Sequence, residues 1–216
     1  MAHLTGQADP VLRQALNPFR YFLKRYFDQS PGVPVEETKA RFAARLDTLV
    51  QALEGLERPL AAAADPRALA AELVRTRSIL GALLGLHWAG SLYESLDGGL
   101  RYQNTLFALK ALLLAECCFH PVVLELEDLH WLDEASHEAL ATLSRNIASY
   151  PLLIVVTSRY ADDGSRPALN LAEGTPVTAI DLNVLAPADL RRLAEEILGG
   201  PVDDGLLALL QERTQA

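Results

Sequence analysis

Two consecutive carboxylates, Glu127 and Asp128, follow a short apolar run over residues 122–126. The run begins after Pro121 and is typical of a buried β-strand. If that strand lies in a parallel sheet, both acids stand at its carboxyl end, where open α/β sheets bind their ligands. Carboxylates placed there can hold Mg²⁺ and orient a water molecule for attack on a phosphate. The simpler alternative is a strand that ends in two solvated acids.

A second apolar run, residues 152–156, is followed by Thr157 and Arg159. In a parallel sheet the carboxyl ends of neighbouring strands meet at one edge. We therefore expect Arg159 to lie near the acid pair, facing an open cleft. Arg159 is more than a solvated surface charge only if those acids lie beside it.

The residues after the acid pair have simpler structural roles. Trp131 and Leu132 are expected to pack the turn onto the sheet. His130 can hydrogen-bond near a phosphate, although a single histidine in such a turn is more often structural. Asp133 suits the N-cap of the next helix, and Glu134 suits its first turn.

The elements around these residues change in character near Pro121. Before it, residues 1–17 look irregular, and apolar side chains then recur at helical spacing in four stretches: 18–28, 36–56, 66–84 and 101–118. After it, short apolar runs alternate with helical patterns, which predicts strands near 122–127, 152–157 and 177–182, and helices near 133–149, 188–198 and 205–213.

This alternation predicts an α/β fold, with a parallel sheet flanked by helices on both faces and a mainly helical N-terminal half. We expect a helical segment over residues 1–120, an α/β core over 121–200, and the start of a further helical segment over 201–216.

Composition excludes several classes of protein. The net charge of −9 argues against direct nucleic-acid binding, because little Lys and Arg is left to neutralise phosphates. Cys117 and Cys118 are adjacent, which suits buried thiols in a reducing cytoplasm better than a disulfide. No signal peptide and no apolar stretch of membrane-spanning length is present, so a soluble chain without membrane contact is expected.

The segment LEDLHWLDEAS, followed by a helix and then by PLLIVVTSR, resembles the nucleotide-binding domain of the STAND class of AAA+-related P-loop regulatory ATPases. The segments PFRYFLKRYF and IDLNVLAPADLRRLAEEILGG resemble other parts of that domain. The resemblance covers nearly the whole chain, and its specific motifs lie in residues 121–159, with weaker support at 180–200.

The resemblance implies roles for four residues. Glu127 and Asp128 would be the Walker B pair, which is catalytic and binds the metal. Arg159, with Thr157, would be the sensor on the γ-phosphate side of the nucleotide. Mg²⁺ and ATP would be the cofactors of the full-length protein. The family more often has Asp first, so which acid binds the metal and which acts as base stays open.

The phosphate-binding loop of such ATPases is missing from this sequence. Its pattern, G-x-x-x-x-G-K-[ST], needs a lysine directly after a glycine. None of the three lysines, Lys24, Lys39 and Lys110, directly follows a glycine. In the resembling family that loop, its strand and its helix precede a segment like the start of this chain, so we expect the chain to begin after them. A winged-helix domain usually follows a segment like the end of this chain.

The missing strand would leave a gap between the strands near 152–157 and 177–182. We expect one of three outcomes: the two strands close up, a second copy pairs across the gap, or the region is poorly ordered. A central strand supplied by residues 1–17 would contradict this placement.

The sequence therefore predicts part of an ATP-binding domain from a multidomain signalling or transcriptional regulator, inactive as an ATPase by itself. The alternative is a non-catalytic interaction module with a degenerate ATPase fold, which binds a protein partner or associates with itself. A third possibility is an unrelated helical binding protein. A GK[ST] loop encoded upstream would separate the first two, and an all-helical circular dichroism spectrum would favour the third.

Overall fold

The computed structural model describes residues 1–11, 14–161, 163–182 and 185–214. The chain forms two compact units, Met1–Thr175 and Pro176–Ala216. Within the described residues, no helix is both long and apolar enough to cross a bilayer.

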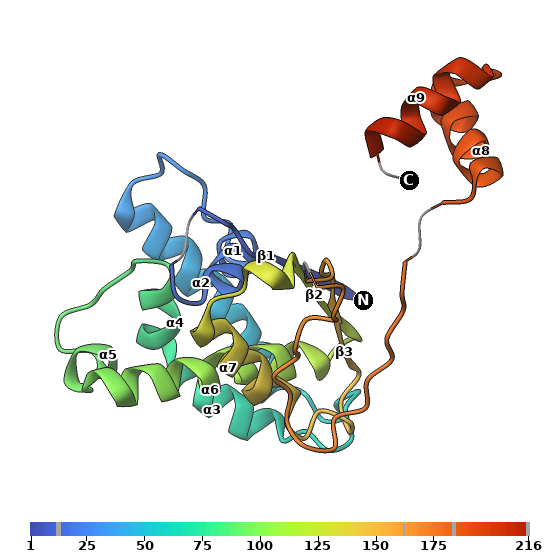
Figure 1. Cartoon of the computed structure of the whole chain (residues 1–216). Helices are drawn as coiled ribbons and strands as arrows, with labels where there is room; N and C mark the ends of the chain where they lie inside the picture. Colours follow the sequence, from blue (N-terminus) through green and yellow to red (C-terminus); the bar gives the residue numbers. More distant parts are fainter. Residues whose placement is uncertain (12–13, 162, 183–184, 215–216) are drawn as a thin grey trace. The chain divides into compact units, whose positions relative to one another are not determined.

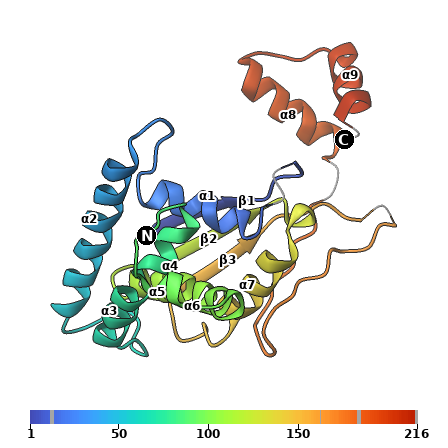
Figure 2. The ribbon, with the colours of Figure 1, turned by 90° about the vertical axis from the view of Figure 1, so that its left-hand side faces the viewer.

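The first unit is built on a three-stranded parallel sheet, ordered β1-β2-β3 (Figure 2). The strands are β1 (Ala2–Gln7), β2 (Val122–Glu127) and β3 (Leu152–Val156). Their first residues are in register, since Ala2 pairs with Val122 and Val122 with Leu152. The predicted α/β fold with a parallel sheet flanked by helices is confirmed.

The prediction that residues 1–17 are irregular is wrong, because β1 lies within them. The segment AHLTGQ has few strongly β-forming residues and contains a glycine, so it carries little strand signal. It forms a strand because β2 supplies a complete ladder. Hydrogen bonds at both ends extend the ladder, from Ala2 N–H to Pro121 O (2.9 Å) and from Ala8 N–H to Glu127 O (3.1 Å).

Gly6 in β1 allows the following helix to approach the sheet closely. A Cβ at this position would lie 2.7 Å from the carbonyl oxygen of Pro18 and 3.0 Å from Leu126 Cδ2. The Gly6→Ala substitution is therefore expected to destabilise the fold by about 1–3 kcal/mol, as overpacking does.

The matched control is Gly98→Ala, since a Cβ at Gly98 meets no atom within 4 Å. Its free energy of unfolding should change by no more than about 0.5 kcal/mol. Urea unfolding of the three proteins measures both effects. Equal midpoints for Gly6→Ala and the unchanged protein would show that α1 does not require the glycine.

The strand predicted at residues 177–182 is absent. This segment has no regular secondary structure, and Val177, Ile180 and Leu182 are all exposed. A strand gains its stability from pairing, and none of the described strands pairs with this segment. β1 lies on the far side of β2, so the outer edge of β3 has no strand partner within the described residues.

Among the described residues of this unit, seven α-helices accompany the sheet (Figure 1). They are α1 (Asn17–Tyr26), α2 (Val35–Glu54), α3 (Pro66–Arg75), α4 (Arg77–Leu83), α5 (Leu92–Ser95), α6 (Gly98–Cys117) and α7 (Glu134–Ser144). The single helix expected over 66–84 is divided at Thr76, whose hydroxyl donates to the carbonyl of Glu72 (2.7 Å). The short α5 lies between the helical stretches predicted at 66–84 and 101–118.

The core lies between the helices and one face of the sheet. Leu124 and Leu126 of β2 and Ile154 of β3 face this core, which also contains much of α6. The apolar side chains of the other face, such as Val123 and Leu153, lie outside the core cluster. The helices expected on both faces are thus found on one face within the described residues.

Glu125 lies on the open face of β2 and is half-buried. Its carboxylate is 2.8 Å from Nε2 of His3 in β1. The partner of this acid is thus a histidine from the strand that the sequence analysis did not predict. Cys117 and Cys118 are free and buried, as predicted.

The second unit contains the helices α8 (Pro187–Leu198) and α9 (Asp204–Thr214), close to their predicted bounds. A small cluster of buried side chains joins them: Leu190, Ala194, Val202 and Leu207. Arg191 bonds both to the carbonyl of Val202 and to the carboxylate of Asp204, which ties the connection to α8.

Candidate functional site at the carboxyl edge of the sheet

Glu127 and Asp128 lie where β2 ends. Asp128 adopts a left-handed backbone conformation (φ 59°), which turns the chain into the short helical turn η1 (Leu129–Trp131). Asp tolerates this conformation better than most residues, because its side chain is short and polar. The turn brings both acids to the carboxyl edge, where they are half-buried.

Thr157 lies directly beside Asp128. The backbone N–H of Asp128 points to Oγ1 of Thr157 at 3.4 Å, and the N–H of Leu129 donates to the carbonyl of Thr157 at 2.8 Å. These bonds continue the β2–β3 ladder past the ends of the strands. The two strand ends therefore meet at one edge.

Arg159 follows on the same edge, and its backbone N–H points to Nδ1 of His130 at 3.5 Å. Its side chain is exposed, and no ion pair joins it to Glu127 or Asp128 among the described residues. Backbone contacts thus place Arg159 on the same edge of the sheet as the acids, with its side chain exposed.

The acid pair supplies two carboxylates, which are oxygen ligands of the kind that Mg²⁺ binds. Within the described part of the chain, no hydrogen bond or ion pair occupies the carboxylate of Glu127 or Asp128. Among the described residues, no three or more His, Cys, Asp or Glu side chains lie together in a way that could hold a metal ion by themselves. Mg²⁺ suits such a place, because it is usually bound by one or two carboxylates together with water and phosphate oxygens.

β1 adds two polar residues to this edge that sequence reading missed. Gln7 is in register with Glu127, and Asp9 follows two residues later. Asp9 accepts a hydrogen bond from the N–H of Val11 (2.7 Å). The only sequence signal was a polar Gln-x-Asp motif after a weak apolar run, and it has meaning only once β1 is recognised as a strand.

Asp133 is the N-cap of α7, as predicted. Its carboxylate accepts from the N–H (3.0 Å) and the hydroxyl (2.6 Å) of Ser136, and from the N–H of Leu16 at 3.3 Å. It thereby links the start of α1 to the start of α7. Burial lowers the pKa of Arg20 in α1, and the charge of Asp133 acts in the opposite direction.

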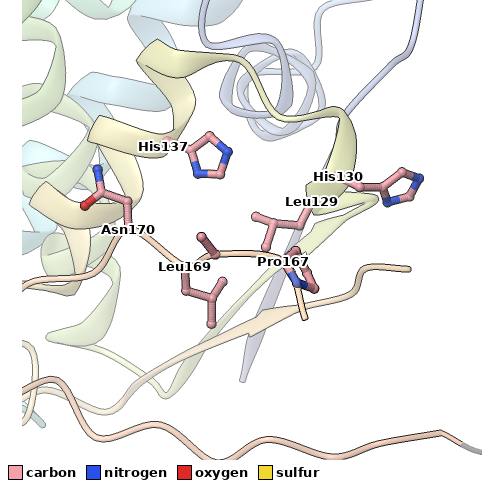
Figure 3. Close-up of a pocket in the computed structure, with 7 residues that line it drawn as sticks. Leu129, His130, His137, Pro167, Leu169 and Asn170 are labelled. Atoms are coloured by element: carbon pink, nitrogen blue, oxygen red, sulfur yellow. The ribbon is translucent and has the colours of Figure 1, made fainter. Parts of the chain in front are cut away.

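A groove of about 550 Å³ lies next to this edge. Figure 3 shows its lining, with Leu129 and His130 from η1, His137 from α7, and residues 167–170 from the following coil. The two imidazoles lie apart in this view and do not converge on one point (Figure 3). The groove was not predicted, because its wall comes from a coil with no sequence pattern of its own.

The fold of the first unit agrees with a match to a known protein family. An AAA ATPase domain family matches residues 4–156, which is most of the first unit and more than half of the chain. The chain belongs to the AAA ATPase domain family. The matched range begins within β1 and ends with β3, so it contains most of β1, all of β2 and β3, and the acid pair.

An uncharacterized protein of Rhizobium meliloti (strain 1021) is 44% identical over 52 residues. The matched stretch is 24% of this chain and 5% of that protein, so the chain spans a small part of that relative's length. No solved structure matches. AAA ATPase domains bind nucleotides, so family membership indicates an ATPase-related function for this fold.

Proposed function

We propose that this AAA ATPase domain carries the acid and sensor side of an ATP site and belongs to a multidomain signalling or transcriptional regulator of the STAND class. Glu127 and Asp128 hold Mg²⁺ and orient water, and Thr157 and Arg159 contact the γ-phosphate side. The observation that carries the proposal is the bond between the ends of β2 and β3, at Asp128 and Thr157. The free thiols Cys117 and Cys118 suit a cytoplasmic protein.

Glu127 and Asp128 would hold Mg²⁺, which would supply positive charge to neutralise the phosphates of ATP. The residues of this chain contribute the protein ligands and the charged groups of the site. The two carboxylates supply oxygen ligands and a base at the sheet edge, and Arg159 supplies a flexible positive charge one strand away. No residue here replaces the glycine-loop amides and lysine, because no lysine follows a glycine.

The 216-residue chain is therefore expected to bind Mg-ATP weakly and to hydrolyse none at a measurable rate. Calorimetric titration should give a dissociation constant of about 1 mM or weaker, or roughly −4 kcal/mol at most. Binding in the low micromolar range would contradict the proposal, because it would require phosphate-binding groups that the acids and Arg159 do not supply.

Weak binding can still be located. In NMR spectra with Mn²⁺ in place of Mg²⁺ and added ATP, the amide signals of Glu127, Asp128 and Thr157 are expected to broaden first. Glu127→Gln should weaken this broadening, and Glu57→Gln, an exposed acid in the loop after α2, should not. Broadening centred on another part of the chain would remove Glu127 and Asp128 from the site.

A non-catalytic interaction module is the second candidate, and the absent phosphate loop favours it. In this case the fold would serve a protein partner or a second copy, without direct contact to nucleic acid or membrane. Mn²⁺-ATP would then broaden no signals at the sheet edge, even at millimolar nucleotide.

A further inference from the structure

Hydrogen bonds join the turn after β2 to the segment after β3. The N–H of Leu129 donates to the carbonyl of Thr157 (2.8 Å), and the N–H of Asp128 points to its hydroxyl (3.4 Å). A further contact runs from the N–H of Arg159 to Nδ1 of His130 (3.5 Å). This last contact reaches Arg159 itself, beyond the end of the sheet ladder.

The direction of the contact defines what the imidazole does. A backbone N–H can only donate, so Nδ1 of His130 accepts, and the proton of the neutral ring lies on Nε2. The distance is long for a hydrogen bond. Such bonds in ligand-free active sites are often long and shorten when the ligand binds.

His130 is itself held in place by its neighbours. The turn η1 is closed by the N–H of Trp131, which donates to the carbonyl of Asp128 (2.8 Å). The ring of His130 lies 5.0 Å from that of Trp131, centroid to centroid, and is half-buried. Leu129, the residue before it, is buried in the core. The acceptor is therefore presented by a fixed turn.

Arg159 has more freedom than the acids. Its side chain is exposed, and an arginine side chain has several rotatable bonds. A contact that fixes its backbone reduces the volume that the guanidinium samples, so the charge meets a phosphate at a lower entropic cost.

We propose that His130 is a positioning residue of the candidate ATP site. Its Nδ1 holds the Arg159 backbone and so sets where the guanidinium meets the γ-phosphate side of the nucleotide. Because His130 follows the acid pair by two residues, the same turn keeps the acids and Arg159 in one relative position. This role rests on the proposed function of Glu127, Asp128 and Arg159.

Two substitutions separate the hydrogen bond from the packing of the ring. His130→Asn keeps an acceptor, because Oδ1 is attached to Cγ as Nδ1 is, and it removes the ring. His130→Phe keeps a ring beside Trp131 and removes the acceptor. His137→Phe is the matched control, because His137 lines the same groove from α7 and lies apart from His130 (Figure 3).

Amide hydrogen exchange of the full chain without nucleotide measures the contact. His130→Phe should speed exchange at the Arg159 amide by about two- to tenfold, as the loss of one hydrogen bond does. His130→Asn and His137→Phe should each change it by less than about twofold. Unchanged exchange in His130→Phe, or equal acceleration in His130→Phe and His130→Asn, would overturn the proposal.

Paramagnetic broadening by Mn²⁺ with ATP tests the consequence for the site. In the unchanged chain the Arg159 amide should broaden together with that of Asp128. His130→Phe should weaken the broadening at Arg159 and keep it at Asp128, and His130→Asn should restore it. Equal broadening at Arg159 in all three proteins would refute the positioning role alone. An absence of broadening at both residues in the unchanged chain would refute the ATP site, and this role with it.

Discussion

Replacing Phe42 by alanine is expected to destabilise the first unit by about 3–5 kcal/mol, the largest effect of any single truncation proposed for this chain. Phe42 is fully buried in α2. Its ring lies 4.6 Å from that of Phe27 and 5.9 Å from that of Trp88, centroid to centroid. The substitution removes apolar contacts and leaves a cavity that this aromatic cluster cannot fill without moving α2.

A Phe→Ala substitution at an exposed helical position separates the effect of burial on stability from the effect of helix propensity. Phe107→Ala in α6 should change the free energy of unfolding by no more than about 0.5 kcal/mol. Both residues lie inside helices, and only Phe42 is buried. Urea unfolding followed by circular dichroism measures the two values, and equal losses would show that the Phe27–Phe42–Trp88 cluster contributes little.

Glu116→Ala is expected to be the second largest loss. Glu116 is 5% exposed in α6 and accepts a hydrogen bond from the hydroxyl of Tyr26. Its carboxylate also lies 3.7 Å from Arg45 Nη2 and 3.3 Å from His120 Nε2. Removing it leaves buried donors unsatisfied, which costs about 2–4 kcal/mol after allowance for the partial exposure of Arg45.

Glu36→Ala is the control for Glu116→Ala, because the Glu36 side chain is 85% exposed and forms an ion pair with the nearby Lys39. Its loss should be about 0.5 kcal/mol or less. If both substitutions lower the free energy of unfolding by the same amount, the buried network around Glu116 does not stabilise the fold.

The alkaline limb of the stability curve tests the same network. Burial, and then the charge of Glu116, raise the pKa of Tyr26. The unfolded chain releases this proton near pH 10, while the native protein retains it. Stability should therefore be complete below pH 10 and fall as the pH rises further. Glu116→Ala should make the alkaline loss shallower, because one of the two causes is removed.

Much of the fold could be predicted from local patterns. The aromatic stripe of α1 and the leucine spacing of α2 and α6 indicate helices, because an amphipathic helix repeats every 3.6 residues. The continuous apolar runs of β2 and β3 indicate strands of a parallel sheet. The cap at Asp133 could also be predicted, because it depends only on residues within one turn.

The wrong predictions for residues 1–17 and for residues 177–182 have the same cause. Residues 2–7 contain His3 and Gly6 and look weak, yet they form β1 because β2 offers a complete ladder and Gly6 admits Pro18. Residues 177–182 alternate more favourably and remain coil, because no described strand pairs with them. Pairing over long sequence separation decides whether a short extended segment becomes a strand, and no local pattern contains that information.

For the candidate site, the sequence by itself pointed to the acid pair, Thr157 and Arg159, because each lies at the end of an apolar run or within three residues after it. Only the tertiary structure decided that Asp128 turns back to meet Thr157, and that β1 adds Gln7 and Asp9 to the same edge. It also decided that β3 pairs with β2 alone among the strands that the structure describes. Residue types and spacing are local, whereas the neighbours of a strand are set by contacts between segments more than a hundred residues apart, as β1 and β2 are.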